Sequence, residues 1–308
     1  MERNEMRVVL IGTPDFSVPS FQKIVDAGYQ VVGVITSVDK PAGRGMNMQK
    51  SAVKQFAEKN NLHILQPTNL KNPEFIAELA QLKADLQVVI AFRMLPEMVW
   101  NMPRLGTVNL HASLLPNYRG AAPINWSIMN GEIETGLSTF RLKHEIDTGD
   151  ILMQKKLDIQ PNENAGQLHD RMMLAGADLM LETLDGIRLN TLTAIAQVFS
   201  KNDKIAPKIF KEHCQIDWKN NGSNIYNQIR GLSPYPVART FLDSKILKVY
   251  DANFTRENHD RYPGVFETDG KSYLHFFCSD GIVSLTDVQI EGKRRMKIDE
   301  FLRGFRMD

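Results

Sequence analysis

Two side chains able to support polar chemistry lie two positions apart in residues 106–123. A short strand-like run covers Thr107 to Leu110, polar side chains lie in quick succession at Asn109, His111 and Ser113, and the run breaks at Leu114-Leu115-Pro116. On an extended strand, Asn109 and His111 lie on one face and Leu110 on the other. An amide N–H can donate to a developing oxyanion, and an imidazole can exchange protons near neutral pH. The spacing therefore indicates a candidate catalytic pair at the end of a strand, where open sheets place their ligands.

A carboxylate follows in the turn-rich sequence Asp147-Thr-Gly-Asp150. If this turn folds back, Asp147 could orient His111 and stabilise its charged form, as carboxylates do behind catalytic histidines. Each motif alone has a commoner explanation. Asn-X-His on a strand is more often two satisfied polar residues, and Asp-Thr-Gly is more often an Asx turn bonded to its own backbone.

The elements that must position these residues begin with a strand at 6–11. A glycine turn follows, then apolar residues at helical spacing over 17–27 and a second strand at 30–36. Strand, helix and strand in this order form a βαβ unit, which predicts a doubly wound, mostly parallel α/β sheet. The first turn, Gly12-Thr-Pro-Asp15, lacks the spaced glycines of a dinucleotide site.

The pattern continues with expected helices at 51–60, 73–82, about 124–130 and 165–184, and Pro123 is tolerated in the first turn of the third of these. Further strands are expected at 63–65, 85–91, 135–142 and 151–159. We therefore expect a catalytic domain over residues 1–188.

Beyond that domain the composition changes to a basic linker, 189–208, and a run of short pieces. A helix near 222–231 precedes short alternating runs, which predict a small β-barrel over residues 209–308. These runs cover 238–242, 246–252, 264–267, 272–278 and 283–290.

The length, composition and net charge of the chain exclude several classes of protein. The chain has 308 residues, 43% of them hydrophobic, and a formal net charge of +1. It can bury a sizeable core, and any nucleic-acid surface must be a local patch. The only cysteines, Cys214 and Cys278, have no metal-like spacing, and no apolar run approaches the ~20 residues of a membrane helix. We expect a cytoplasmic protein with free thiols and no membrane partner.

Taken together, the motifs resemble a known family. Asn109-X-His111-X-Ser113-Leu-Leu-Pro116, with Arg119-Gly-Ala-Ala-Pro123 and Asp147-Thr-Gly-Asp150 behind it, is similar to the formyltransferases that use 10-formyltetrahydrofolate. Three further landmarks narrow the resemblance to members that formylate methionyl-tRNA: Ile11-Gly-Thr-Pro-Asp-Phe16, Asp39-Lys-Pro-Ala-Gly-Arg-Gly45 and Ile216-Asp-Trp218. The resemblance implies a Rossmann-like formyltransferase fold followed by an OB-like β-barrel domain that binds tRNA.

The resemblance also implies roles for individual residues. Asn109, His111 and Asp147 would be catalytic in a direct transfer that needs no metal. The 10-formyltetrahydrofolate would bind to Ser113, Leu114, Leu115 and Pro116, and to an apolar wall at Phe92 and Met94. Residues 92–96 are one residue shorter than the usual family pattern and have Phe92-Arg93 in place of its Ala-Tyr-Gly opening.

The implied partner is initiator methionyl-tRNA, bound by a protein that we expect to be a monomer. The long loop at 37–54 would approach the acceptor end, although Met46-Asn47 stands where the family usually has two lysines. Residues 204–308 hold 17 basic and 14 acidic side chains, and this modest surplus supports a weak phosphate contact. The expected tRNA-binding residues are Lys40, Arg44, Lys50, Lys208, Lys293, Arg294 and Arg295.

Three other interpretations stay open. The acceptor could be a small amine such as glycinamide ribotide or a sugar nucleotide amine, although such an acceptor needs neither the barrel nor the basic loop. A non-catalytic RNA-binding protein would not require Asn109, His111 and Asp147. A nicotinamide oxidoreductase is disfavoured by the missing glycine fingerprint.

Overall fold

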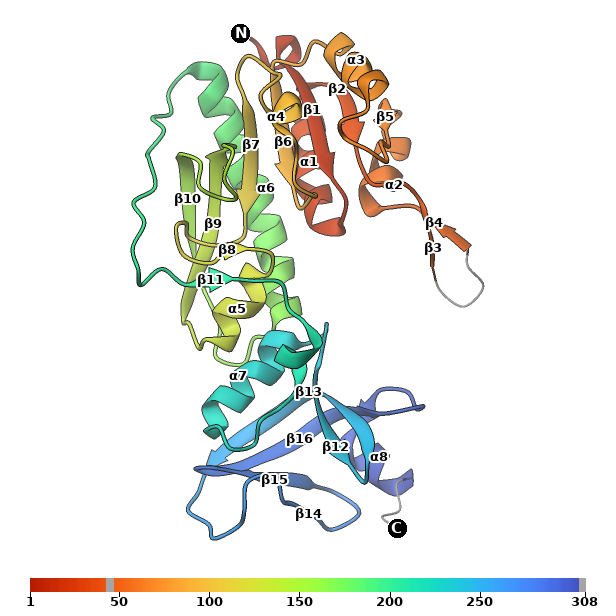
Figure 1. Cartoon of the computed structure of the whole chain (residues 1–308), viewed down its shortest axis with the longest axis vertical. Helices are drawn as coiled ribbons and strands as arrows, with labels where there is room; N and C mark the ends of the chain where they lie inside the picture. The colour runs from red at the N-terminus through yellow and green to blue at the C-terminus, as the bar shows by residue number, and fades with distance from the viewer. Residues whose placement is uncertain (43–46, 305–308) are drawn as a thin grey trace. The chain divides into compact units, whose positions relative to one another are not determined.

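The computed structural model describes residues 1–42 and 47–304 of the chain (Figure 1). The chain forms two compact units. The first comprises Met1–Arg119, Gly136–Leu157 and Asp170–Lys204, and the second comprises Gly120–Thr135, Asp158–His169 and Ile205–Asp308.

A seven-stranded sheet forms the centre of the first unit, in the order β10-β9-β7-β6-β1-β2-β5. Strands β7, β6, β1, β2 and β5 pair in parallel, and β9 joins β7 antiparallel. The chain builds the sheet on one side of β1 and then returns to its other side, so the expected doubly wound, mostly parallel fold is confirmed. The strands are β1 (Arg7–Gly12), β2 (Gln30–Ile35), β5 (Ile64–Leu65), β6 (Leu86–Ile90), β7 (Thr107–His111), β9 (Glu134–Arg141) and β10 (Ile151–Asp158).

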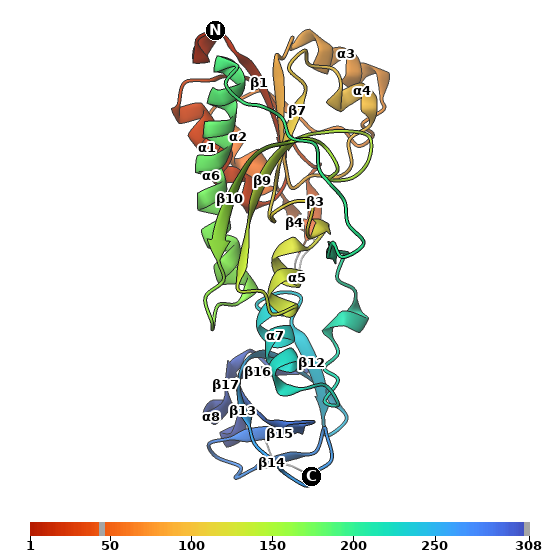
Figure 2. The same cartoon turned by 90° about the vertical axis from the view of Figure 1, so that its left-hand side faces the viewer.

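Helices cover both faces of this sheet. Figure 2 shows α1, α2 and α6 on one side and α3 and α4 on the other. Their starts follow from local chemistry, since Ser51 and Asn72 cap α2 and α3 by accepting from backbone N–H groups, and Pro73 suits the first turn of α3. The elements are η1 (Arg3–Glu5), η2 (Asp15–Ser17), α1 (Val18–Asp26), α2 (Ala52–Lys59), α3 (Pro73–Gln81), α4 (Glu97–Trp100) and α6 (Ala165–Leu189).

The stretch expected to be a long loop contains a short antiparallel hairpin. Strand β3 (Lys40–Ala42) pairs with β4 (Asn47–Gln49) in the register Lys40 to Gln49. Arg44 and Met46, which the sequence placed in this loop, lie outside the described residues.

The second unit contains a curled antiparallel sheet in the order β12-β13-β16-β15-β14, with β17 pairing β16. Two register shifts between Val249 and Ala252 interrupt the long β13–β16 ladder, and such bulges increase the local twist of a strand. This arrangement agrees with the small barrel-like domain expected from the sequence. The strands are β12 (Ala238–Leu242), β13 (Lys245–Arg256), β14 (Phe266–Thr268), β15 (Leu274–Cys278), β16 (Gly281–Ile290) and β17 (Met296–Lys297).

Three helical elements accompany this sheet: η3 (Lys211–Cys214), α7 (Gly222–Leu232) and α8 (Ile298–Gly304). The second unit also includes α5 (Pro123–Met129), which begins at Pro123 as expected. Strands β8 (Arg119–Gly120) and β11 (Ile205–Ala206) form a two-stranded ladder, and Gly120 lies so close to the Ala206 carbonyl that a Cβ would stand 2.4 Å from it.

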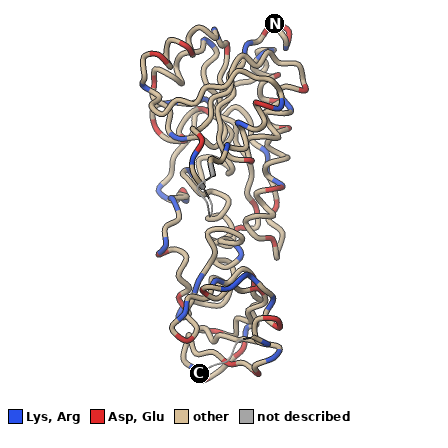
Figure 3. Tube along the Cα trace, turned by 90° about the vertical axis from the view of Figure 1, so that its right-hand side faces the viewer, with Lys and Arg blue, Asp and Glu red and all other residues tan. Residues whose placement is uncertain are grey.

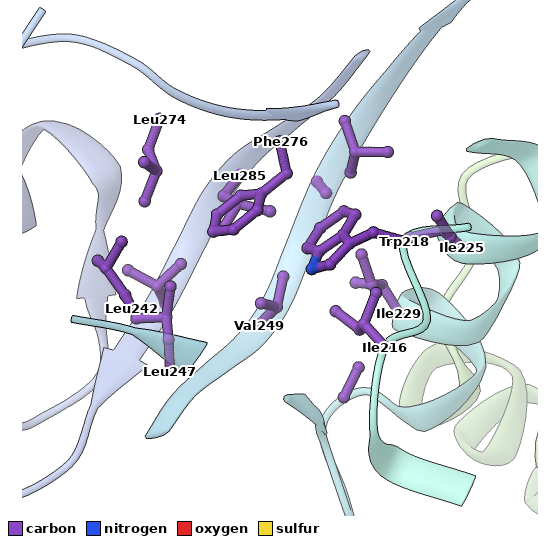
Figure 4. Packing of buried hydrophobic residues seen from close by; sticks show 14 of the residues in the cluster. Ile216, Trp218, Ile225, Ile229, Leu242, Leu247, Val249, Leu274, Phe276 and Leu285 are labelled. Carbon is purple, nitrogen blue, oxygen red and sulfur yellow. The ribbon is translucent and has the colours of Figure 1, made fainter. Parts of the chain in front are cut away.

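Trp218 lies at the centre of the second unit's core (Figure 4). Its indole stacks on the ring of Phe276 with centroids 4.5 Å apart, and its Nε1–H donates to Thr240 Oγ1 over 2.9 Å. Ile225 and Ile229 of α7 pack into the same cluster. The core therefore packs the helix against the curled sheet around an aromatic pair, and the indole N–H of that pair has a hydrogen-bond partner.

Cys214 and Cys278 are buried free thiols, as expected. Burial raises the pKa of both thiols. None of the helices within residues 1–42 and 47–304 is long and apolar enough to cross a membrane.

We expect Trp218→Ala to lower the free energy of unfolding of the second unit by about 3–5 kcal/mol, because it leaves a large cavity in a packed core. Trp218→Phe keeps a ring on Phe276 and loses the hydrogen bond to Thr240, so we expect a smaller loss that includes about 1 kcal/mol for the bond. Urea unfolding measures both. Tyr262→Ala is the control, since Tyr262 is 83% exposed in the same unit; an equal effect of all three changes would contradict the assignment.

Candidate functional site

The candidate site begins at the carboxyl end of β7. Asn109 pairs with Val89 of β6, and His111 pairs with Ser138 of β9. Leu110 is buried on the opposite face against α6, where a Cβ on Gly176 would stand 2.7 Å from its Cδ2. The expected placement of Asn109 and His111 on one face of a strand is therefore confirmed.

The His111 ring is buried, and both of its nitrogens face acceptors. Nε2 lies 2.8 Å from the Tyr118 carbonyl oxygen, and Nδ1 lies 3.8 Å from Oδ2 of Asp147. A carbonyl oxygen can only accept a hydrogen bond, so Nε2 must carry a hydrogen. A proton that the ring exchanges therefore enters or leaves at Nδ1, beside the carboxylate.

Asp147 lies in the turn between β9 and β10 and is buried beside His111. The turn runs along β7, because Leu142 N–H donates to Thr107 at the start of that strand while Asp147 reaches His111 at its end. The structure thus brings Asp147 and His111 together. The 3.8 Å between Nδ1 and Oδ2 is longer than a hydrogen bond. Hydrogen bonds between catalytic groups are often this long before substrate binds.

The turn after Asp147 requires a glycine at position 149. A Cβ at this position would stand 1.6 Å from the Arg141 carbonyl oxygen, so only a residue without a side chain fits against β9. Asp147 itself adopts a left-handed backbone conformation, with φ of 55°, which Asp tolerates better than most residues.

Asn109 carries an unpaired polar atom. Its Oδ1 is buried without a hydrogen-bond partner among the described residues. Buried polar atoms are normally satisfied, and exceptions call for an explanation such as a functional role. Asn109 Oδ1 is thus an unused acceptor on the His111 face of β7.

The loop that the sequence assigned to folate is shaped by its own hydrogen bonds. Ser113 Oγ donates to the Asn117 carbonyl over 2.6 Å. Ser138 Oγ donates to the Ser113 carbonyl and accepts from Leu115 N–H, at 2.7 and 3.0 Å. The Ser113 hydroxyl is therefore used within the loop. Leu115 is buried, whereas Leu114 and Pro116 are half-buried.

The other expected folate contacts differ from each other in exposure. Phe92 is half-buried and packs against the apolar cluster that includes Val89 and Leu95, whereas Met94 is 70% exposed. Arg93 donates to the backbone carbonyls of Pro67 and Thr68. The guanidinium is thus held by the protein's own chain beside this wall.

The basic residues expected to bind tRNA are not equally available. Lys40 is exposed at the start of the β3–β4 hairpin, and Arg44 lies outside the described residues. Lys50 forms an ion pair with Glu58 at 2.8 Å, and hydrogen bonding to that carboxylate raises the pKa of Lys50.

In the second unit, basic and acidic residues are interspersed along the chain (Figure 3). Arg294 pairs with Glu300, and Arg295 makes two hydrogen bonds to Asp287, at 2.8 and 2.9 Å. Burial opposes ionisation of Asp287, but hydrogen bonds from Arg295 and a neighbouring lysine outweigh it, so the pKa of Asp287 is lowered.

Lys208 and Lys293 are exposed and form no ion pair with any residue of 1–42 or 47–304. The Nζ of Lys208 lies 5.7 Å from the centre of the Phe210 ring. These two lysines therefore keep an unpaired charge, unlike Arg294 and Arg295.

Sequence reasoning missed two residues that shape the site. The Tyr118 carbonyl contacts His111, and the Ser138 hydroxyl bridges the loop after β7. Ser138 had only a weak signal, a hydroxyl within the strand expected at 135–142. Tyr118 had none, because it contributes a backbone atom. Among the described residues, no group of three or more His, Cys, Asp or Glu side chains could hold a metal ion.

We expect Gly149→Ala to destabilise the protein by about 2 kcal/mol or more, since the added methyl must displace the turn or strand β9. Gly304→Ala is the matched control, because a Cβ there meets nothing within 4 Å. Thermal and urea unfolding measure both. A Gly149→Ala protein as stable as the control would show that the turn does not pack as closely as described.

Comparison with known proteins identifies the family. The family model described as formyl transferase matches residues 6–184, and the model for the formyl transferase C-terminal domain matches residues 208–306. A Bacteroides thetaiotaomicron protein named methionyl-tRNA formyltransferase is 50% identical, covering 100% of this chain and 98% of its own. A Flavobacterium johnsoniae protein of the same name is 48% identical over 97% of this chain and 96% of its own.

Solved structures of similar fold are more distant in sequence. WlaRD, a sugar 3N-formyltransferase, has a TM-score of 0.69 at 22% identity and covers 94% of this chain and 99% of its own. An N-formyltransferase from Helicobacter canadensis has a TM-score of 0.70 at 21% identity, covering 94% and 100%. The two domain matches and the full-length relatives establish that this chain belongs to the formyl transferase family.

Proposed function

We propose that this protein transfers the formyl group of 10-formyltetrahydrofolate to the amino group of initiator methionyl-tRNA. The observation that carries this conclusion is the identity of about half of all residues, over essentially the whole chain, to proteins named methionyl-tRNA formyltransferase. The similarity extends over the second unit as well as the first.

Formyl transfer to an amine makes two demands on the site. The amine nitrogen attacks the formyl carbon, the carbonyl oxygen becomes an oxyanion, and the folate nitrogen leaves with a proton. The amine loses a proton as its new bond forms. The site must therefore supply a donor for the oxyanion and a group that moves protons.

Asn109 meets the first demand. Its side-chain N–H would donate to the oxyanion, and such a donor contributes on the order of 3 kcal/mol in acyl transfer. Its Oδ1, which is buried without a protein partner within the described part of the chain, would then accept from the N–H of the attacking amine. One amide would thereby align both reactants.

His111 and Asp147 meet the second demand. Because Nε2 is committed to the Tyr118 carbonyl, Nδ1 exchanges the proton, and the Asp147 carboxylate stabilises the resulting positive ring. Closure of the 3.8 Å gap on substrate binding would complete the pair. The formyl group passes directly between substrates, since Ser113 donates its hydroxyl to the Asn117 carbonyl rather than to a base.

The folate would lie against the loop formed by residues 113–116, with Phe92 and Met94 as its apolar wall. Exposure of Met94 and half-exposure of Phe92 leave apolar surface that a pterin ring could cover.

The tRNA would contact the 37–54 loop and the expected domain 209–308 together with the 189–208 linker. Lys40, Lys208 and Lys293 would bind phosphate directly, whereas Lys50, Arg294 and Arg295 would first exchange a protein carboxylate for it. Arg44 would add to the loop contact. We place the enzyme in the cytoplasm, where charged tRNA is found, and expect it to act as a monomer.

A sugar nucleotide amine is the second candidate acceptor, because the solved structures of similar fold include sugar N-formyltransferases. Those proteins are only 21–22% identical to this chain, which is evidence for the fold alone. The acceptor is therefore decided by experiment.

We expect the wild type to formylate initiator methionyl-tRNA and not elongator methionyl-tRNA, and Asn109→Ala to lower kcat by about 10²–10³-fold through loss of the oxyanion donor. Asn101→Ala, at an exposed asparagine of the same unit, should leave kcat unchanged. The assay follows formyl transfer from 10-formyltetrahydrofolate to charged tRNA. Formylation of a sugar nucleotide amine, with none of tRNA, would replace the proposed acceptor.

We expect Lys208→Ala and Lys293→Ala each to raise KM for tRNA several-fold with kcat unchanged, and to reduce the salt dependence of binding by about one phosphate contact. Arg295→Ala should instead lower the free energy of unfolding, by about 1–3 kcal/mol, because Asp287 loses two charged hydrogen bonds. Filter binding at several salt concentrations and urea unfolding separate the two effects. Equal salt slopes for wild type and both lysine variants would exclude these lysines from the phosphate contact.

A further inference from the structure

Residues 195–204, within the expected linker, make a series of contacts with the loops around His111. We call them the connecting segment. The segment follows α6, which ends at Leu189, and runs past strand β10 (Figure 1). There Ile195 and Ile151 exchange two backbone hydrogen bonds of 2.8 Å each. Most side chains of the segment are exposed, Val198 to 84%. Gln197 is half-buried between exposed neighbours, so it alone among residues 195–200 turns inward.

Gln197 holds the Asp147 turn. Its Nε2 donates to the backbone carbonyls of Asp147 and Gly149, over 2.9 and 2.7 Å. Its Oε1 is buried without a hydrogen-bond partner in the described part of the chain. The amide is therefore held through its two donors, which both bond to the turn that carries the carboxylate.

The turn needs such support. Asp147 has φ of 55°, a left-handed conformation that is strained for a residue other than glycine. Because the two bonds from Gln197 fix carbonyls on either side of Thr148, they limit rotation of the peptide units that set the direction of the Asp147 side chain.

The far end of the connecting segment holds the other partner of His111. Tyr118 N–H donates to the Lys204 carbonyl over 2.6 Å, and Lys204 N–H donates to Asn117 Oδ1 over 3.1 Å. Tyr118 also has a positive φ, 57°, and its carbonyl is the one 2.8 Å from Nε2 of His111.

The middle of the segment is anchored beside that same loop. The Arg119 guanidinium lies over the Phe199 ring at 4.4 Å and 3.8 Å from the Asp203 carboxylate. Both acceptors that face the His111 ring thus belong to loops that are bonded to one stretch of ten residues.

We propose that the connecting segment positions the catalytic pair, and that Gln197 is the positioning residue for Asp147. Gln197 touches no reacting atom and acts only through the turn. The proposal rests on the proposed function, since it assumes that His111 and Asp147 carry out formyl transfer.

The test is Gln197→Met, which keeps the length of the side chain and removes both donors. We expect kcat to fall about 10- to 100-fold, because small displacements of a catalytic group have effects of this size. KM for the folate and for tRNA should stay within about twofold, since no substrate contact is lost. The matched control is Gln228→Met. Gln228 likewise donates to two backbone carbonyls, those of His213 and Gln215, at 2.9 and 3.0 Å, and its loss should leave kcat unchanged.

A double-mutant cycle distinguishes positioning from general support of the fold. If Gln197 acts through Asp147, Gln197→Met should cause little further loss of kcat in an Asp147→Asn background. An equal fractional loss in both backgrounds, or a rise in KM at unchanged kcat, would overturn the proposal.

Unfolding midpoints of all variants are measured alongside. Should Gln197→Met fail to fold, Gln197→Glu replaces it, since a carboxylate also cannot donate; if neither folds, the residue is structural and the proposal fails. If instead the proposed function were wrong, the wild type itself would form no formylmethionyl-tRNA, and this result distinguishes the two failures.

Discussion

The imidazole of His111 lies between two acceptors, the Tyr118 carbonyl and the Asp147 carboxylate, and the first unit is arranged to keep both in place. The contact with Tyr118 commits Nε2 as a donor and leaves Nδ1 beside a carboxylate. Each acceptor sits on a residue with a positive φ, Tyr118 and Asp147. Such conformations persist only where surrounding contacts hold them, so the site depends on the loops more than on the strand.

The sheet contributes by bringing distant chain segments to β7. Parallel pairing with β6 places Asn109 and His111 at the carboxyl end of a central strand, where α/β sheets bind ligands. Antiparallel pairing with β9 returns the chain along β7, so that the turn after β9 extends from Thr107 to His111. The close fit of Gly149 against Arg141 then limits where this turn can lie.

The second unit shows how charges counted in a sequence can overstate a binding surface. The stacked rings of Trp218 and Phe276 lie at the centre of its core. Most of the basic side chains in residues 293–297 form ion pairs with acidic side chains. Arg295 stabilises the buried Asp287, whereas Lys208 and Lys293 remain unpaired among the described residues. A phosphate backbone would meet a few available lysines rather than a uniformly basic face.

The sequence by itself determined what depends on local order: the first βαβ unit, the placement of Asn109 and His111 on one face, and the helix beginning at Pro123. These follow from residue periodicity and backbone restrictions, which act over a few positions. Only the tertiary structure decided that Asp147 reaches Nδ1, that a Tyr118 carbonyl reaches Nε2, that a hairpin forms at Lys40, and that the connecting segment contacts both loops of the site. These contacts join residues far apart in the chain, so they depend on strand order and loop path, which local patterns do not encode.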